Sequence, residues 1–295
     1  MSNGIEKLNV TGWSMNVSKK NMLFSEEMIQ QSLELLKQWE VAFPREDTWV
    51  QETFGIPSFM VRLDCIGGRQ DQVYEIEERP SGVGVSQVVS PLFRHNLERL
   101  SHDWPAYDVV VSGARTSYDD HLHGKKTLTL EEAKDSKSLL LIRAEPNEEM
   151  FHGFENRSVS SLKEKGNKSY GVALGLWTEV DTESRLPWKN GFALKPLRGS
   201  KSKGVEIWAP GRVNGKSTET RIERTLEKYG RMYCQPLIHP LCSGIEKFPS
   251  MIYRVFFGYN VVSTKWECMG GIWMARPNIK IHGATDSVIG PIAFC

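Results

Sequence analysis

A lysine that ends an apolar run and leads into a loop of glycine, serine and basic residues could hold the phosphates of a nucleotide. Lys195 has this position in "GFALKPLRGSKSKGVEIW", and the loop after it contains Arg198, Gly199, Ser200 and Gly204. Backbone N–H groups and ammonium groups of such a loop can fold over triphosphate oxygens. A solvated basic hairpin tip has the same composition. However, a lysine at the end of a buried strand is costly unless its ammonium meets an anion.

Three carboxylates in "RLDCIGGRQDQVYEIEERPSG" could bind a divalent cation. The Gly-Gly turn between two strand-like runs favours a hairpin. Glu75 and Glu77 are two residues apart, so they point to one face of their strand, and Asp64 lies on the paired strand. Three carboxylates facing one way repel each other unless a cation lies among them, and Mg²⁺ prefers oxygen ligands. The alternative is a hairpin whose carboxylates face solvent while Ile76 is buried.

Two later segments fit the same nucleotide. The extended run "MYCQPLIHPL" contains Gln235, Pro236 and Leu237. Proline leaves this run at a sheet edge, where one backbone acceptor and one backbone donor can hold adenine. A simple exit from strand to loop is the alternative. Arg254 lies in the middle of the aromatic run "MIYRVFFGYN", where a phosphate or the carboxylate of a structural salt bridge would satisfy it.

The segment "GGIWMARPNIKIHGATDSVIGPI" is polar and rich in turns between apolar residues. We expect it to form a wall of the active site, with Arg276, Asn278 and His282 as candidates for substrate contacts. His282 is a possible general base, and a hydrogen-bonded structural histidine is the alternative.

The segment "GRVNGKST" is not interpreted as a phosphate-binding P-loop. The pattern G-x-x-x-x-G-K-[ST] requires glycine at position 210, where this chain has Pro210. No apolar strand leads directly into the segment.

Hydrophobic periodicity predicts the elements that carry these residues. A helix capped by Ser25 runs through Glu40, with Met28, Leu35 and Trp39 on its buried face.

Residues 106–113 and 138–145 are short β-branched or aliphatic runs typical of buried strands in a sheet covered by helices. A helix over 217–229 lies among the strand-like runs of the second half, which include 251–266. The first half is therefore predicted to be α/β and the second half α+β with antiparallel pairs. We place the boundary between segments 1–152 and 153–295, in a loop-rich region that extends to Gly166.

Composition excludes several classes of function. The 295 residues carry a formal net charge of +1, which gives no overall attraction to nucleic acid or to acidic lipid. The five cysteines contain no C-x-x-C pair and are odd in number, as expected for a reduced, intracellular protein. No apolar run is long enough for a membrane helix, and no secretory signal is present. We therefore expect a cytoplasmic protein that contacts neither nucleic acid nor a membrane.

Taken together, the segments resemble the ATP-grasp enzymes. In that family a nucleotide lies between two α+β subdomains, and the metal segment has the form R-x-D…E-x-N…P-G. Here the metal segment resembles Arg62-Leu63-Asp64, Glu75-Ile76-Glu77 and Pro80-Ser81-Gly82. It precedes the nucleotide segment, as in circularly permuted members such as the amide ligase domain of glutathionylspermidine synthetase. Permutation is physically mild because the ends of a domain often lie close together.

The resemblance implies an ATP- and Mg²⁺-dependent ligase that joins a small-molecule or peptide carboxylate to an amine through an acylphosphate. It implies that Lys168 and Lys195 contact the phosphates beneath the glycine-rich flap and that Gln235 to Leu237 hold adenine. Asp64, Glu75 and Glu77 would hold Mg²⁺, and Arg254 would neutralise the transferring phosphate.

This chain departs from the family pattern at one metal position. The usual metal-binding asparagine is Glu77 here, which leaves open which of Glu75, Glu77 and Glu78 bind the metal. The alternatives are a phosphotransferase on the same fold and a catalytically degenerate nucleotide-binding protein. The sequence names neither the substrates nor the oligomeric state.

Overall fold

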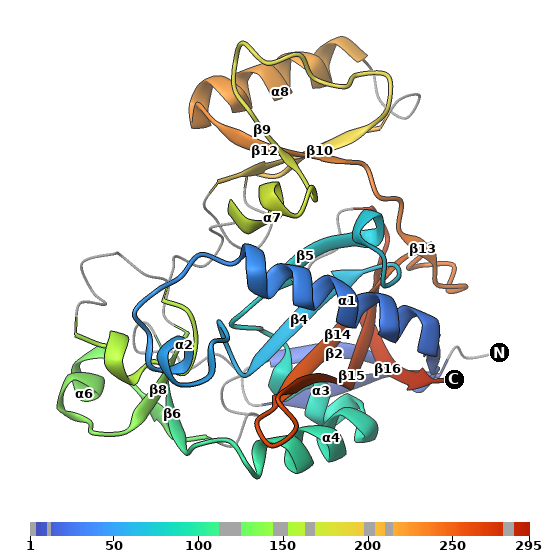
Figure 1. Cartoon of the computed structure of the whole chain (residues 1–295). Helices are drawn as coiled ribbons and strands as arrows, with labels where there is room; N and C mark the ends of the chain where they lie inside the picture. Colours follow the sequence, from blue (N-terminus) through green and yellow to red (C-terminus); the bar gives the residue numbers. More distant parts are fainter. Residues whose placement is uncertain are drawn as a thin grey trace. The chain divides into compact units, whose positions relative to one another are not determined.

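The computed structural model describes residues 4–10, 13–111, 125–143, 153–162, 169–197, 204–209, 215–279 and 286–295. These residues form a mixed α+β protein in which most strand pairs are antiparallel (Figure 1). Within the described ranges, no helix is both long and apolar enough to cross a membrane.

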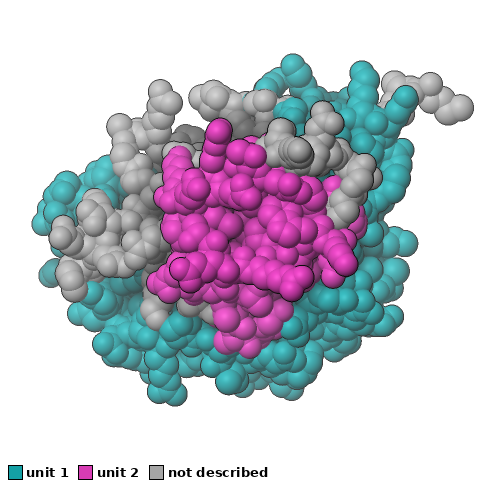
Figure 2. Space-filling view, turned by 90° about the horizontal axis from the view of Figure 1, so that it is seen from above, with its two compact units in different colours: residues 1–164, 240–295 teal, residues 165–239 magenta. Residues whose placement is uncertain are grey.

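The chain divides into two compact units, coloured separately in Figure 2. Unit 1 comprises Met1–Glu164 and Pro240–Cys295, and unit 2 comprises Lys165–His239. The first crossing between the units lies inside the predicted loop-rich boundary region. The second crossing, after His239, was not predicted, so the predicted segment 153–295 is divided between the two units.

One sheet of unit 1 is built from strands at both ends of the chain. Across the sheet, each strand pairs with the next in the order β1 (Ile5–Val10), β2 (Trp13–Ser18), β16 (Val288–Phe294), β15 (Lys265–Arg276), β14 (Ser250–Asn260), β4 (Met60–Cys65) and β5 (Val73–Glu77). Two shorter strands pair outside this order, β3 (Met22–Phe24) with β16 and β13 (Leu241–Cys242) with β14. The return of the chain to unit 1 thus supplies β14, which pairs with the predicted hairpin β4–β5.

Helices cover both faces of this sheet. On one face α1 (Glu26–Ala42) places Trp39 against Trp266, with ring centres 6.1 Å apart. On the other face lie α3 (Val83–Val89) and α4 (Pro91–Ser101), whose Phe93 packs against Phe256 at 4.7 Å. The predicted cap of α1 is confirmed, because the Ser25 hydroxyl accepts a hydrogen bond from the third residue of the helix.

A second, parallel sheet of unit 1 confirms the two predicted buried strands. Its order is β7 (Thr127–Leu128), β6 (Tyr107–Val110) and β8 (Leu139–Ile142), and α6 (Leu130–Asp135) packs beside it. Three short helices complete the described part of unit 1: α2 (Trp49–Phe54), η1 (Gln70–Gln72) and η3 (Glu155–Arg157).

Unit 2 is an antiparallel sheet with helices on its two faces. The strand order is β11 (Glu206–Trp208), β10 (Phe192–Pro196), β12 (Met232–Pro236) and β9 (Thr178–Val180), and the helices are α7 (Ser169–Ala173) and α8 (Gly215–Tyr229). The core between α8 and the sheet contains Phe192, Leu194, Ile222 and Leu226. Because side chains alternate along β10, Lys195 lies on the face opposite α8.

The run 251–266 is not one strand. The chain turns after Asn260, and β15 begins at Lys265 and pairs back along β14. The predicted helix over 217–229 is confirmed and begins two residues earlier.

Candidate functional site

Charged side chains gather on one face of the hairpin β4–β5. Arg62 is directly opposite Glu77, and Asp64 is directly opposite Glu75. Directly opposite residues of an antiparallel pair share a face, so all four point the same way. This is the face that α3 and α4 cover, because Phe256, which contacts α4, is opposite Arg62 on β14.

Arg62 is the cation among these carboxylates. Its Nε donates to Asp64 Oδ1 at 2.6 Å, and its Nη1 forms an ion pair with Glu77 Oε2 at 2.7 Å. The Arg62 side chain is 4% exposed. Burial alone would lower the pKa of this guanidinium, but the charges of Asp64 and Glu77 outweigh burial and raise it. Arg62 therefore stays charged and satisfies carboxylates that would otherwise repel each other.

The register of β14 brings a second predicted residue to this face. Arg254 is opposite Asp64, and its Nη2 lies 3.4 Å from Asp64 Oδ2. Of the two partners considered for Arg254, a phosphate and a structural carboxylate, the structure shows the carboxylate. This carboxylate belongs to Asp64, which was predicted to bind the metal. Two arginines and Asp64 now form one cluster.

The turn after β5 lies over the guanidinium of Arg62. Nη1 donates to the backbone oxygen of Ser81 and, at 3.0 Å, to its hydroxyl. Ser81 N–H donates to Glu77 at 3.2 Å. The next residue, Gly82, has φ +91°, a conformation that side chains disfavour. The Pro-Ser-Gly sequence therefore fixes the turn that holds this arginine.

The carboxylates of the hairpin do not by themselves form a complete metal site. In the described ranges, no three His, Cys, Asp or Glu side chains lie close enough to hold an ion. The alternative for this hairpin was that its carboxylates face solvent while Ile76 is buried. Ile76 is buried, but Asp64 is only 7% exposed and does not face solvent. Mg²⁺ commonly needs only one or two protein carboxylates when phosphates complete its shell. Asp64 and Glu77 are thus the two carboxylates of this face that contact Arg62 and could also be donors to such an ion.

In unit 2, Lys195 is buried next to an aromatic ring. The residue is 9% exposed, and its Nζ lies 5.1 Å from the ring centre of Trp177. Lys195 is opposite Tyr233 on β12. The prediction of a lysine at the end of a buried strand is confirmed.

Gln235 shares the face of Lys195, since it is two residues from Tyr233 along β12. Leu237 N–H donates to Gly191 O at 3.0 Å, so the backbone groups of Leu237 point toward β10. Backbone groups alternate in direction along a strand. The carbonyl of Pro236 therefore points away from β10, beyond the last β9 partner at Cys234. This carbonyl is the acceptor that the end of β12 could offer to a base.

Gly204 is the described residue of the predicted flap. Its φ is +74°, and an added Cβ would lie 2.7 Å from the Tyr229 hydroxyl. Four of the predicted phosphate-binding residues lie outside the described ranges: Lys168, Arg198, Gly199 and Ser200.

The predicted substrate residues lie at the end of β15. Arg276 is 6% exposed and donates through Nη2 to both carboxylate oxygens of Asp286, at 2.7 and 2.6 Å. Asn278 is two residues further on, and His282 lies outside the described ranges. Arg276 therefore joins the end of β15 to Asp286, which lies further along the segment that was predicted to form a wall.

Two buried charged residues, Glu78 and Arg79, follow the hairpin. Arg79 donates to the carbonyl of Ile142, the last residue of β8, at 3.1 Å. Burial raises the pKa of Glu78 to about 7, although Arg79 opposes this change. Glu78 is 7% exposed and follows the last residue of β5, Glu77.

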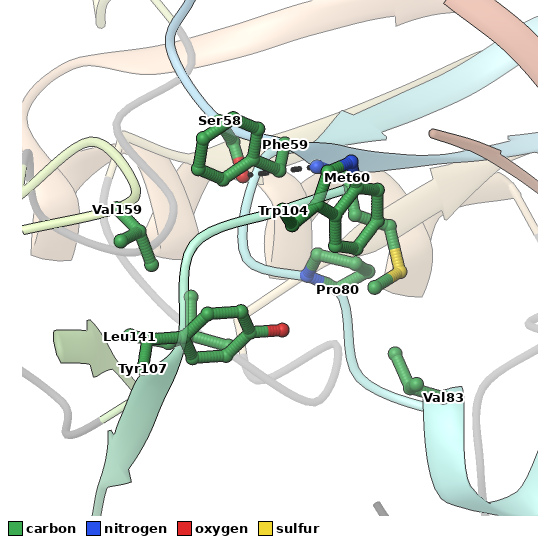
Figure 3. Close-up of a pocket in the computed structure, with 9 residues that line it drawn as sticks. All are labelled: Ser58, Phe59, Met60, Pro80, Val83, Trp104, Tyr107, Leu141 and Val159. Atoms are coloured by element: carbon green, nitrogen blue, oxygen red, sulfur yellow. Dashed lines mark hydrogen bonds between the residues drawn. The ribbon is translucent and has the colours of Figure 1, made fainter. Parts of the chain in front are cut away.

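An apolar cavity lies between this hairpin and the parallel sheet (Figure 3). Its volume is about 20 Å³, which suffices for one water molecule and not for a nucleotide. Nine residues line it: Ser58, Phe59, Met60, Pro80, Val83, Trp104, Tyr107, Leu141 and Val159.

A scan against protein-family models and a search of curated protein sequences found no match to the chain.

The sequence reasoning assigned no part to two side chains of these clusters. Arg62 could have been assigned, because it is two residues from Asp64 and must share its face. Trp177 could not, because it precedes β9 and reaches Lys195 only through the pairing of β9 with β12 and of β12 with β10.

Proposed function

We propose that this protein is a ligase of the ATP-grasp type that uses ATP and Mg²⁺ to join a carboxylate to an amine. The observation that carries the proposal is the pairing of β14 with β4, which sets Arg254 beside Asp64. The family resemblance assigned these two residues, which are far apart in the sequence, to phosphate and metal. Their adjacency supports the circularly permuted order.

Unit 2 supports the nucleotide part of the proposal. Lys195 and Gln235 share one face of its sheet. Lys195 supplies positive charge to the phosphates, where a cation that is already desolvated acts strongly. The Pro236 carbonyl accepts a hydrogen bond from the adenine edge.

Unit 1 supports the transfer part. Asp64 and Glu77 would hold Mg²⁺, which offsets charge on the phosphates. Arg62 and Arg254 stabilise negative charge on the transferring phosphoryl group. Arg62 also keeps the carboxylates in place before the ligands bind, because both are bound to it.

The reaction proceeds in two balanced steps. A carboxylate oxygen of the first substrate attacks the γ-phosphorus of ATP, the bond to ADP breaks, and an acylphosphate forms. The nitrogen of the amine then attacks the acyl carbon, phosphate leaves, and the amine loses a proton. No covalent bond to the protein is needed, so catalysis consists of positioning and charge stabilisation.

Hydroxylamine, a surrogate amine, tests this chemistry because it converts acylphosphates to hydroxamates. The full chain is incubated with ATP, Mg²⁺, hydroxylamine and a panel of amino-acid, dicarboxylic and peptide acids. ADP and hydroxamate should form in equal amounts. Lys195→Ala should abolish both, and Lys189→Ala, an exposed lysine of the same unit, should not. Phosphate transfer to a stable product without hydroxamate would instead identify a phosphotransferase, and unchanged activity of Lys195→Ala would refute the lysine assignment.

A further inference from the structure

The ammonium of Lys195 is held over an indole ring in a largely buried position. Its Nζ lies 5.1 Å from the Trp177 ring centre, within the range of a cation–π interaction. Lysine is strongly hydrated in water, and burial removes most of that hydration. The negative face of tryptophan is the best aromatic substitute for the lost water.

Three neighbours fix the position of this ring. Trp177 is 1% exposed and contacts Tyr170 and Tyr233, with ring centres 6.2 and 5.8 Å away. Gly171 in α7 lies directly against it, since an added Cβ would be 2.0 Å from two carbons of the indole. Clamped on several sides, the indole is a rigid platform. Gly171 is therefore the residue that lets α7 lie against it.

A described acid on this face forms an ion pair of its own. Glu179 on β9 is opposite Tyr233, which is opposite Lys195, so all three share a face. Glu179 Oε1 lies 2.6 Å from Arg231 Nη1. The contact of Lys195 with the indole differs in kind from this ion pair, because the ring carries no net charge.

We propose that Trp177 is a positioning residue for Lys195. Its ring keeps the ammonium charged and correctly placed before the nucleotide phosphates arrive. This inference rests on the proposed function, in which Lys195 contacts those phosphates. A lysine positioned in advance loses less conformational freedom on binding, so the platform increases affinity for ATP.

The test measures the protonation of Lys195 in the full chain without nucleotide. The rate at which acetic anhydride acetylates Lys195 is followed across pH by peptide mass spectrometry, since only the neutral amine reacts. In Trp177→Leu the midpoint should fall by about one pH unit. In Trp177→Phe, which keeps an aromatic face, it should fall less. A purely structural role would raise the rate through greater access without moving the midpoint.

The control is Trp208→Phe, a buried tryptophan of the other core of unit 2, in which the Lys195 midpoint should not change. Because Trp177→Leu could fail to fold, a second measurement uses a variant that keeps the platform. In protein labelled with 5-fluorotryptophan, the fluorine resonance of Trp177 should move as Lys195 loses its proton. It should stay constant in Lys195→Met. An unchanged midpoint in Trp177→Leu, or a Trp177 resonance that ignores Lys195, overturns the proposal.

Titration with ATP and Mg²⁺ separates this inference from the proposed function. Trp177→Leu should bind ATP about tenfold more weakly than wild type. A shifted midpoint in a chain whose wild type binds no ATP would support the Trp177–Lys195 pairing and refute the nucleotide function. If wild type binds ATP and the variants change neither the midpoint nor the affinity, the nucleotide function is supported and the role of Trp177 is refuted.

Discussion

Replacement of Arg62 by methionine removes the cation between two nearly buried carboxylates. The side chains of Asp64 and Glu77 are 9% and 14% exposed. Removal of one partner of a buried ion pair costs about 3–5 kcal/mol. Arg254 remains 3.4 Å from Asp64, and Ser81 N–H still donates to Glu77, so both carboxylates keep part of their stabilisation. We therefore expect the free energy of unfolding at pH 7 to fall by about 3 kcal/mol, at the lower end of this range.

Urea unfolding of the full chain, followed by tryptophan fluorescence, measures this loss. The deficit of Arg62→Met should shrink as the pH falls toward about 4, because protonation of the carboxyl groups removes the uncompensated charge. The triple variant Arg62→Met, Asp64→Asn, Glu77→Gln should regain most of the stability at pH 7. The control is Arg69→Met in the same hairpin, whose exposed pair with Asp71 should contribute nothing measurable. A loss below about 1 kcal/mol at pH 7, well under the range for a broken buried pair, would refute the reasoning, as would a triple variant no more stable than the single one.

Three further predictions follow from other contacts. Because burial raises the folded-state pKa of Glu78 to about 7, above its ordinary value, wild type should lose stability as pH rises from about 5 to 8. In urea titrations over this pH range, the free energy of unfolding of Glu78→Gln should fall by about 2 kcal/mol less than that of wild type. Parallel pH curves for the two proteins would show that Glu78 is not the group responsible. Gly171→Ala should lower the melting temperature more than Gly230→Ala, which meets only backbone strain at φ +72° and no atom within 4 Å; equal losses would contradict the close contact with the indole. Asp64→Asn should raise the Mg²⁺ concentration needed for half-maximal ADP formation, whereas the exposed Asp71→Asn in the same hairpin should not; identical Mg²⁺ dependence would remove Asp64 from the metal set.

Local pattern was sufficient to predict the hairpin and the direction of its acids. The turn glycines and the two-residue spacing of Glu75 and Glu77 depend only on neighbouring residues, and the register confirms that Asp64 shares their face. The same spacing argument applies to Arg62. Attention to the carboxylates alone led to a metal ion as the compensating cation, where an arginine of the hairpin itself is present.

Long-range pairing could not be predicted from local pattern. The chain returns to unit 1 after His239 because β14 adds to the edge of β4, and nothing in the composition of residues 240–295 marks that pairing. The same applies to β2, whose partner β16 is at the other end of the chain. The contact of Trp177 with Lys195 likewise depends on the register of unit 2.

Calorimetric titration with a non-hydrolysable ATP analogue and Mg²⁺ tests the central claim most directly, because it needs no knowledge of the substrates. We expect saturable binding to the wild-type chain, and weaker binding in Lys195→Ala and in Asp64→Asn. Absence of binding to wild type, or an affinity that either variant leaves unchanged, would contradict it.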